Sequence, residues 1–152
     1  MPVRSIHTPF GDMTVAQEGV AIVSVDWGWG RDQDDTPLLR EALAQLDAYF
    51  SGELKTFDLP LAIEGTPFQR RVWQTMQQIP YGETRTYGDV AKELNSAARA
   101  VGGACGANRL PILIPCHRIL GTGGIGGYSG GEGPATKQQI LDLERMAARC
   151  LL

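Results

Sequence analysis

Residues 108–119 read Asn108-Arg109-Leu110-Pro111-Ile112-Leu113-Ile114-Pro115-Cys116-His117-Arg118-Ile119. The apolar run 110–115 predicts a short, buried, extended segment that ends in a turn at Pro115. Cys116 follows that turn directly, with a His and an Arg after it. Both neighbours can lower the pKa of a thiol, and the thiolate is the competent nucleophile. We therefore expect Cys116 to be reactive, and to meet His117 if the chain turns there or if a water molecule bridges them.

A glycine-rich loop and a final helix follow this stretch. Residues 121–126 fit the pattern G-x-G-x-x-G, but the glycines after them cannot open a helix, which argues against a dinucleotide site. Residues 134–151 predict a helix whose apolar face holds Ile140, Leu143, Ala147 and Cys150. Glu144 lies at the edge of that face. If it faces inward, it would orient His117 toward Cys116 as in a catalytic triad; the alternative is an exposed helical acid.

Three short helices are predicted upstream. Thr66-Pro67 with Gln69 predicts a capping box at the start of the first helix, and Thr86 caps the second. Ser96 is predicted to cap the third, over residues 97–107, which is built almost wholly from Ala, Val and Gly, with Arg99 near its start. Two short helices that flank a tight turn fit a helix-turn-helix, which binds DNA; the alternative is an ordinary helical hairpin.

The N-terminal part has a different pattern. Short strands over 4–8, 13–17 and 19–26 predict a β-meander, and Thr36-Pro37 predicts the start of a helix that runs to Phe50. The polar segment 53–65 then indicates a boundary. We expect a mixed α/β (α+β) protein: a meander-plus-helix domain at 1–62 and, at 63–152, a mostly helical domain with a winged or helix-turn-helix DNA-binding motif.

The net charge of −3 hides a division along the chain. Residues 1–64 carry 4 Lys and Arg against 11 Asp and Glu, whereas residues 65–131 carry 7 against 3. The basic segment is expected to meet DNA with moderate, salt-sensitive affinity. Apolar runs are too short for a membrane span, and the N-terminus lacks the apolar stretch of a secretory signal, so we expect a cytoplasmic protein with reduced thiols. Three scattered Cys and two His argue against a metal site.

The stretch 108–119, with its Pro-Cys-His-Arg core, closely resembles the active-site signature of the O6-alkylguanine-DNA alkyltransferases, the methylated-DNA–protein-cysteine methyltransferases. Similar positions follow in the same order from residue 65 to residue 145: Phe68-Gln69, Trp73, Pro80-Tyr81-Gly82, Thr86-Tyr87, residues 98–104 and Gly127-Tyr128-Ser129-Gly130-Gly131. The chain departs from the family at Arg109, where a proline is common, and at Cys105, where a bulky aliphatic residue is frequent. A second thiol near DNA would be a candidate for slow alkylation.

The resemblance implies a role for each matched residue. Cys116 would accept the alkyl group, with His117 as a base acting through water, Glu144 as its orienter, Asn108 as a clamp across the turn and Tyr87 as the proton donor to the departing guanine. Contacts with DNA would come from Arg99, which fills the gap left by the flipped base, from the small residues Ala98, Ala100, Gly102 and Gly103, and from Arg118, which would also secure loops. The alkylguanine pocket would be formed by Tyr87, Cys116, Ile119, Tyr128 and Ser129.

The implied reaction is a single, irreversible transfer from O6-alkylguanine, chiefly O6-methylguanine and also O4-methylthymine, to Cys116. The partner would be double-stranded DNA, bound through its minor groove by a monomer, and neither a cofactor nor a metal is expected. Two alternatives stay open: a sensor of alkylated DNA that performs no chemistry, against which Cys116 argues, and a cysteine hydrolase, which would need an oxyanion hole and turnover.

Overall fold

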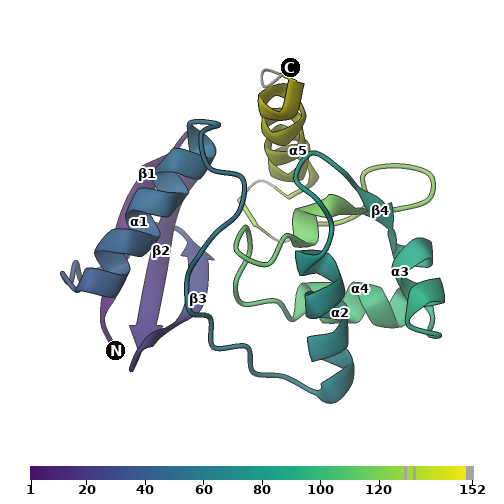
Figure 1. The fold of residues 1–152 in the computed structure, drawn as a ribbon, viewed down its shortest axis with the longest axis horizontal. Helices are drawn as coiled ribbons and strands as arrows, with labels where there is room; N and C mark the ends of the chain where they lie inside the picture. The colour runs from purple at the N-terminus through teal and green to yellow at the C-terminus, as the bar shows by residue number, and fades with distance from the viewer. Residues whose placement is uncertain (129, 132, 150–152) are drawn as a thin grey trace. The chain divides into compact units, whose positions relative to one another are not determined.

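The computed structural model describes residues 1–128, 130–131 and 133–149, and the chain divides into two units, Met1–Ile63 and Glu64–Leu152. The first unit opens with a three-stranded antiparallel sheet in the order β1-β2-β3 (Figure 1). Its strands are β1 (Val3–Thr8), β2 (Gly11–Glu18) and β3 (Ala21–Trp27). Gly11 and Gly19 adopt positive φ at the two turns, which favours glycine there. The predicted meander is confirmed.

Helix α1 (Pro37–Phe50) covers one face of this sheet (Figure 1). The Thr36 hydroxyl accepts a hydrogen bond from the Leu39 amide, as predicted for an N-cap. Fully buried side chains from the helix and the sheet form the core of the unit, including Leu39, Leu46, Tyr49, Met13 and Val15. The polar segment after α1 forms backbone hydrogen bonds with the edge of β3, where Ile22 and Leu61 form a parallel β-bridge.

The second unit contains the helix-turn-helix. Its elements are α2 (Pro67–Gln77), β4 (Arg85–Thr86), α3 (Tyr87–Glu93), α4 (Ala98–Gly106), the short 3-10 helix η1 (Cys116–Arg118), β5 (Ile119–Leu120) and α5 (Pro134–Arg149). Capping boxes begin α2 at Thr66 and α3 at Thr86, which confirms both predictions. The strands β4 and β5 pair in parallel, so the strand that follows η1 lies beside the strand that leads into α3.

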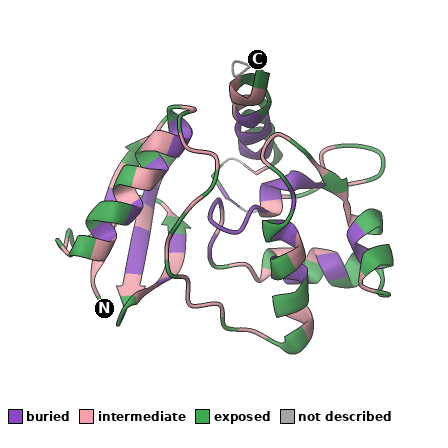
Figure 2. Cartoon of the chain, viewed as in Figure 1, coloured by how far each residue is buried: buried purple, intermediate pink, exposed green. Residues whose placement is uncertain are grey.

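Helix α4 begins differently from the prediction. Its N-cap residue is Ala97, which has no side-chain oxygen to accept a bond, so the predicted cap at Ser96 is wrong. The Ser96 amide instead donates to the Ala91 carbonyl and closes the turn after α3. Packing fixes α4 in place: Val101 and Ala104 are buried, and the Trp73 indole donates to the Ala104 carbonyl at 2.9 Å. Figure 2 shows α4 with buried and exposed residues alternating along its length.

Four of the residues at 110–114 are buried as predicted, with Pro111 intermediate, but the segment is not extended. The Ile114 amide donates to the Leu110 carbonyl at 2.8 Å, which closes a tight loop, and Ile112 has a φ of 73°. A β-branched residue rarely adopts this left-handed conformation, and such strain costs about 1–3 kcal/mol. The surrounding core holds it, since Ile112 is only 2% exposed.

The buried face of α5 coincides only partly with the expected one: Ile140 is buried as predicted. Its buried residues are Thr136, Lys137, Ile140, Leu141 and Glu144. Leu143 and Ala147, which were predicted to share this face, are only half-buried. The buried face is therefore rotated from them toward Leu141 and Glu144. Cys150 lies outside the described residues. Among the described residues, none of the helices is long and apolar enough to cross a membrane.

Candidate active site

Cys116 sits at a sharp turn that the backbone forms around Pro115. The Cys116 amide donates to the Ile114 carbonyl at 2.8 Å, and Pro115 has φ −80° and ψ 67°, the geometry of an inverse γ-turn. Cys116 then begins η1, in which the Arg118 amide donates to the Pro115 carbonyl. The turn predicted at Pro115 is confirmed, and it directs consecutive side chains to different surroundings.

Asn108 holds this turn from the side. Its Nδ2 donates to the Ile114 carbonyl at 3.0 Å, and its Oδ1 accepts from the Leu110 amide at 2.9 Å. The Asn108 side chain also forms a hydrogen bond to Cys116. One amide group therefore ties both ends of the loop and the thiol together, in accordance with the clamp predicted for Asn108.

A cavity of about 280 Å³ opens beside Cys116. Its walls come from α3, α4, η1 and the glycine-rich loop: Tyr87, Gly102, Cys105, Gly106, Cys116, Gly127 and Tyr128. The structure thus brings together three of the predicted pocket residues, namely Tyr87, Cys116 and Tyr128. Ile119 is fully buried and its side chain does not line the cavity, so its place in the alkylguanine pocket stays a prediction. Ser129 lies outside the described residues.

Behind Cys116, a fully buried carboxylate joins α5 to η1. Glu144 Oε2 lies 2.7 Å from His117 Nε2 and accepts from Arg118 Nη2 at 2.9 Å, while Oε1 accepts from Arg118 Nε at 2.9 Å. Glu144 and His117 are 0% exposed. The inward orientation of Glu144 is thereby confirmed over the exposed alternative, and the carboxylate is central to its face of α5 rather than at the edge.

The ionisation of this cluster follows from its contacts. Burial raises the pKa of Glu144, but the hydrogen bonds and charges of His117 and Arg118 outweigh burial and hold it at about 2. Burial lowers the pKa of His117 despite the Glu144 contact, so the imidazole is neutral. An ionised Glu144 only accepts, so Nε2 carries the proton and Nδ1 has a lone pair. Within the described part of the chain, the buried Nδ1 has no hydrogen-bond partner.

The pKa of Cys116 departs from the prediction. Burial raises it, while the Asn108 hydrogen bond and the charge of Lys137 lower it. The sequence neighbours His117 and Arg118 were expected to lower it, but both are engaged by Glu144 on α5. Burial also raises the pKa of the neighbouring thiol, Cys105, to about 12. Neither resting thiol is therefore activated merely by its neighbours in the chain.

Arg118 does not fit the predicted contact with DNA. It is 7% exposed, and its guanidinium donates to Glu144 and to the Ile79 carbonyl, so all three nitrogens are engaged. The assignment of Arg118 to DNA binding is therefore wrong, whereas its predicted structural role is confirmed. Arg118 ties α5, η1 and the end of α2 into one cluster.

The first turn of α4 is exposed, as a surface that meets DNA must be. Ala98, Arg99 and Ala100 are all exposed. Farther along the helix, a Cβ atom added at Gly102 or Gly103 would meet no described atom within 4 Å. The helix therefore offers a thin outer surface with one cation near its N-terminus, and this surface adjoins the cavity through Gly102.

Sequence reasoning missed Lys137. This lysine is 0% exposed, and its Nζ donates to the Gly127 carbonyl at 3.1 Å in the wall of the cavity. Its position relative to Ile140, Leu141 and Glu144 is i, i+3, i+4 and i+7, a spacing that places all four on one helix face. That spacing could have revealed a buried cation on the same face as the buried carboxylate.

Comparison with known proteins agrees with this arrangement of a cavity-lining thiol beside a helix-turn-helix. Residues 67–146 match the family model described as 6-O-methylguanine DNA methyltransferase, DNA binding domain, and residues 2–63 match that of its ribonuclease-like domain. The constitutive methylated-DNA–protein-cysteine methyltransferase of Bacillus subtilis is 43% identical to the chain, and the match covers 93% of each protein. The Methanosarcina acetivorans protein named methylated-DNA–protein-cysteine methyltransferase is 43% identical, over 91% of this chain and 94% of the relative.

A solved structure agrees over nearly the whole chain. Mycobacterium tuberculosis OGT, crystallised in complex with DNA, superimposes with a TM-score of 0.87 and is 40% identical, covering 97% of this chain and 94% of the other. The chain belongs to the 6-O-methylguanine DNA methyltransferase family, whose members include proteins named methylated-DNA–protein-cysteine methyltransferase.

Proposed function

We propose that the chain repairs DNA by moving the alkyl group of O6-alkylguanine, chiefly O6-methylguanine and also O4-methylthymine, onto its own Cys116. The observation that carries the proposal is the cavity that Cys116 lines together with Tyr87, Tyr128 and the later part of α4, the helix whose first turn is exposed. The names of the relatives point to the same chemistry. We assign both DNA binding and chemistry to the domain at 63–152, acting as a monomer.

The proposed reaction is one displacement at an sp³ carbon. The bond from Cys116 Sγ to the alkyl carbon forms while the bond from that carbon to O6 breaks, and guanine leaves with the electron pair. The thiol proton passes through a water molecule to His117 Nδ1, the buried lone pair that is otherwise unpaired among the described residues. The ionised Glu144 then stabilises the imidazolium through Nε2, at 2.7 Å.

Tyr87 suits the role of proton donor to the departing base. Burial, together with the nearby thiols Cys105 and Cys116, raises the pKa of Tyr87 to about 12. The phenol therefore keeps its proton at neutral pH and is available to donate a hydrogen bond into the cavity. A charge that develops on guanine as the bond to O6 breaks would be stabilised by this donor.

Access to the alkyl group requires the nucleotide to leave the duplex, because the reacting carbon is otherwise stacked inside it. We propose that α4 enters the minor groove, where its small residues let the backbone approach closely, and that Arg99 occupies the gap in the stack. The product is a thioether, which is chemically stable, so one chain repairs one lesion.

Intact-mass spectrometry tests the proposal. The protein is incubated with duplex DNA that carries O6-methylguanine, and we expect each chain to gain one methyl group in place of a hydrogen, located at Cys116 by peptide mapping. An unchanged mass with retained binding of the methylated DNA would instead indicate a sensor. Repeated turnover of an acyl substrate without mass gain would indicate a hydrolase.

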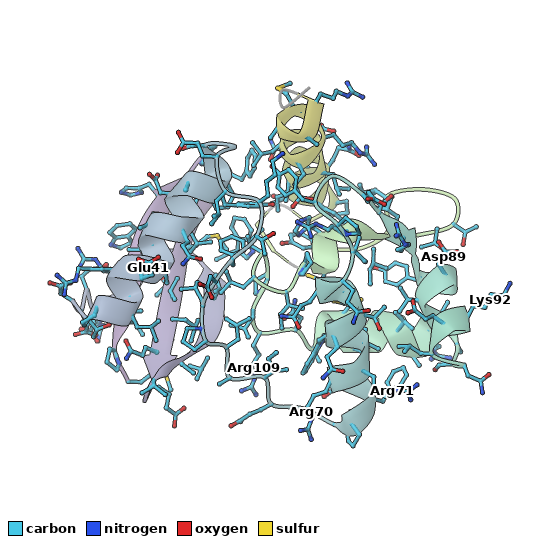
Figure 3. The ribbon with its side chains drawn as sticks, in the orientation of Figure 1. Glu41, Arg70, Arg71, Asp89, Lys92 and Arg109 are labelled. Carbon is cyan, nitrogen blue, oxygen red and sulfur yellow. The ribbon has the colours of Figure 1, made fainter. Side chains whose placement is uncertain are left out.

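Replacing Arg99 by alanine separates base extrusion from chemistry. We expect Arg99→Ala to slow transfer from duplex DNA at least about tenfold, since the gap in the stack loses its occupant, while the reaction with free O6-benzylguanine is unchanged. Rates from quenched reactions with both substrates check this result. The matched control is Arg70→Ala, because Arg70 is an exposed arginine that points away from α2 (Figure 3). Equal losses with both substrates would contradict the role of Arg99.

A further inference from the structure

Lys137 is a buried cation that faces the cavity wall rather than solvent. Its side chain is 0% exposed, although lysine is rarely buried without a partner, because an ammonium group loses its hydration. Nζ donates to the Gly127 carbonyl at 3.1 Å and lies 5.6 Å from the centre of the Tyr87 ring. Gly127 and Tyr87 both line the cavity that contains Cys116.

The glycine-rich loop is shaped to let Lys137 reach this position. Gly126 adopts a φ of 78°, and a Cβ atom there would lie 3.1 Å from Tyr87 Cε2 and 3.4 Å from Lys137 Nζ. The positive φ favours glycine, and a Cβ atom would also come within 3.0 Å of the Gly121 backbone nitrogen, so glycine best suits the close packing of loop, phenol ring and ammonium group. Lys137, Tyr87 and the loop therefore form one packed wall of the cavity.

The charges around the cavity single out the thiols as the partners of Lys137. The titratable groups around Lys137 are Tyr87 on α3, Cys105 on α4 and Cys116 and His117 on η1, while Glu144 lies on the same buried face of α5. Glu144 is paired with Arg118 and His117, and among the described residues no carboxylate forms an ion pair with Lys137. The groups that favour its ammonium form are Cys116 and then Cys105, against the opposing effect of burial.

We propose that Lys137 is a positioning residue whose positive charge stabilises the Cys116 thiolate during attack, while its hydrogen bond to Gly127 holds the cavity wall. The proposal rests on the proposed function of Cys116 as the alkyl acceptor. Lys137 gives up no proton: the Sγ proton leaves toward His117, and the ammonium group supplies only its charge. Once Cys116 has become a neutral thioether, the Lys137 ammonium group no longer has a thiolate to balance its charge.

Thiol alkylation by iodoacetamide as a function of pH tests the charge directly. The rate at Cys116 is followed by peptide mass spectrometry in the wild type, in Lys137→Gln, which keeps a donor for the Gly127 carbonyl but has no charge, and in Lys137→Arg, which keeps the charge. We expect the midpoint of the Cys116 profile to rise by about one pH unit in Lys137→Gln, with about tenfold slower reaction at neutral pH, and to return toward the wild-type value in Lys137→Arg. Equal midpoints in the wild type and in a folded Lys137→Gln would overturn the proposal.

A second measurement uses the unsubstituted chain, so it does not depend on how the variants fold. The ¹³Cε resonance of Lys137 is titrated before and after Cys116 is methylated chemically, with methyl iodide and without DNA. We expect its midpoint to fall after methylation, because the thioether can no longer balance the ammonium charge, and an unchanged midpoint would overturn the proposal. Neither readout involves DNA repair, whereas the intact-mass experiment requires no role for Lys137. Failure of the proposed function and failure of the proposed charge pair are therefore distinguishable.

Discussion

Cys116→Ser is expected to abolish transfer from O6-methylguanine while binding of methylated duplex DNA persists. A serine hydroxyl fits the same turn, but it is far less acidic and less nucleophilic than a thiol, so the rate should fall by at least about a thousandfold. Intact mass measures the transfer, and fluorescence anisotropy with a labelled duplex measures the binding. Transfer at the wild-type rate in Cys116→Ser would remove Cys116 from the reaction.

Cys105→Ser is the matched control, because Cys105 lines the same cavity. Burial raises the pKa of Cys105 to about 12, which disfavours its thiolate, whereas at Cys116 the Asn108 hydrogen bond opposes the effect of burial. We expect Cys105→Ser to transfer methyl at nearly the wild-type rate. Loss of transfer in this variant, with retention in Cys116→Ser, would reassign the acceptor.

Glu144→Gln is expected to destabilise the protein by about 3–5 kcal/mol, because it leaves the guanidinium of Arg118 buried without its counter-charge. Glu144 accepts hydrogen bonds from both Arg118 nitrogens that face it and contacts His117, and an amide can replace only part of this set. Urea denaturation at neutral pH measures the loss. A loss below about 1 kcal/mol would contradict the structural importance of the cluster.

The contribution of Glu144 to the stability of the protein is also expected to depend on pH. The pKa of Glu144 falls to about 2 in the folded protein, below its unfolded value, so its contribution is complete above about pH 5 and is lost as the pH falls toward 2. The difference in unfolding free energy between the wild type and Glu144→Gln should therefore shrink in acid. Glu83→Gln is the control: Glu83 forms an exposed ion pair with Arg85, and such pairs contribute about 0–1 kcal/mol.

Helix starts and the turn before Cys116 could be predicted because their signals are local. Thr36, Thr66 and Thr86 each accept a bond from a backbone amide three residues later, and each is recognisable from the few residues around it. Pro115 likewise sets its own turn. The inward position of Glu144 was less certain, since helix periodicity alone leaves a residue near the edge of a stripe ambiguous.

The features that the sequence did not reveal depend on contacts between distant residues. Arg118 meets Glu144 across 26 residues, and this contact removes Arg118 from the surface. The direction of the Cys116 pKa shift depends on how far the fold excludes water from the thiol. The residues next to Cys116 in the sequence do not indicate this burial. A run of apolar residues likewise predicts burial but not dihedral angles, so it predicts an extended segment where Ile112 is left-handed.

Helix α4 is thin at the expense of its own stability. Three of its nine residues are glycine, each of which disfavours a helix by about 1 kcal/mol relative to alanine. The N-cap residue, Ala97, also provides no side-chain hydrogen bond to the first turn. The helix persists because Val101 and Ala104 are anchored in the core. Alanine at Gly102 or Gly103 would make the helix easier to form and also thicker where it faces outward. A stable helix and a thin helix are therefore opposing requirements at this surface, and the glycines of α4 favour the thin one.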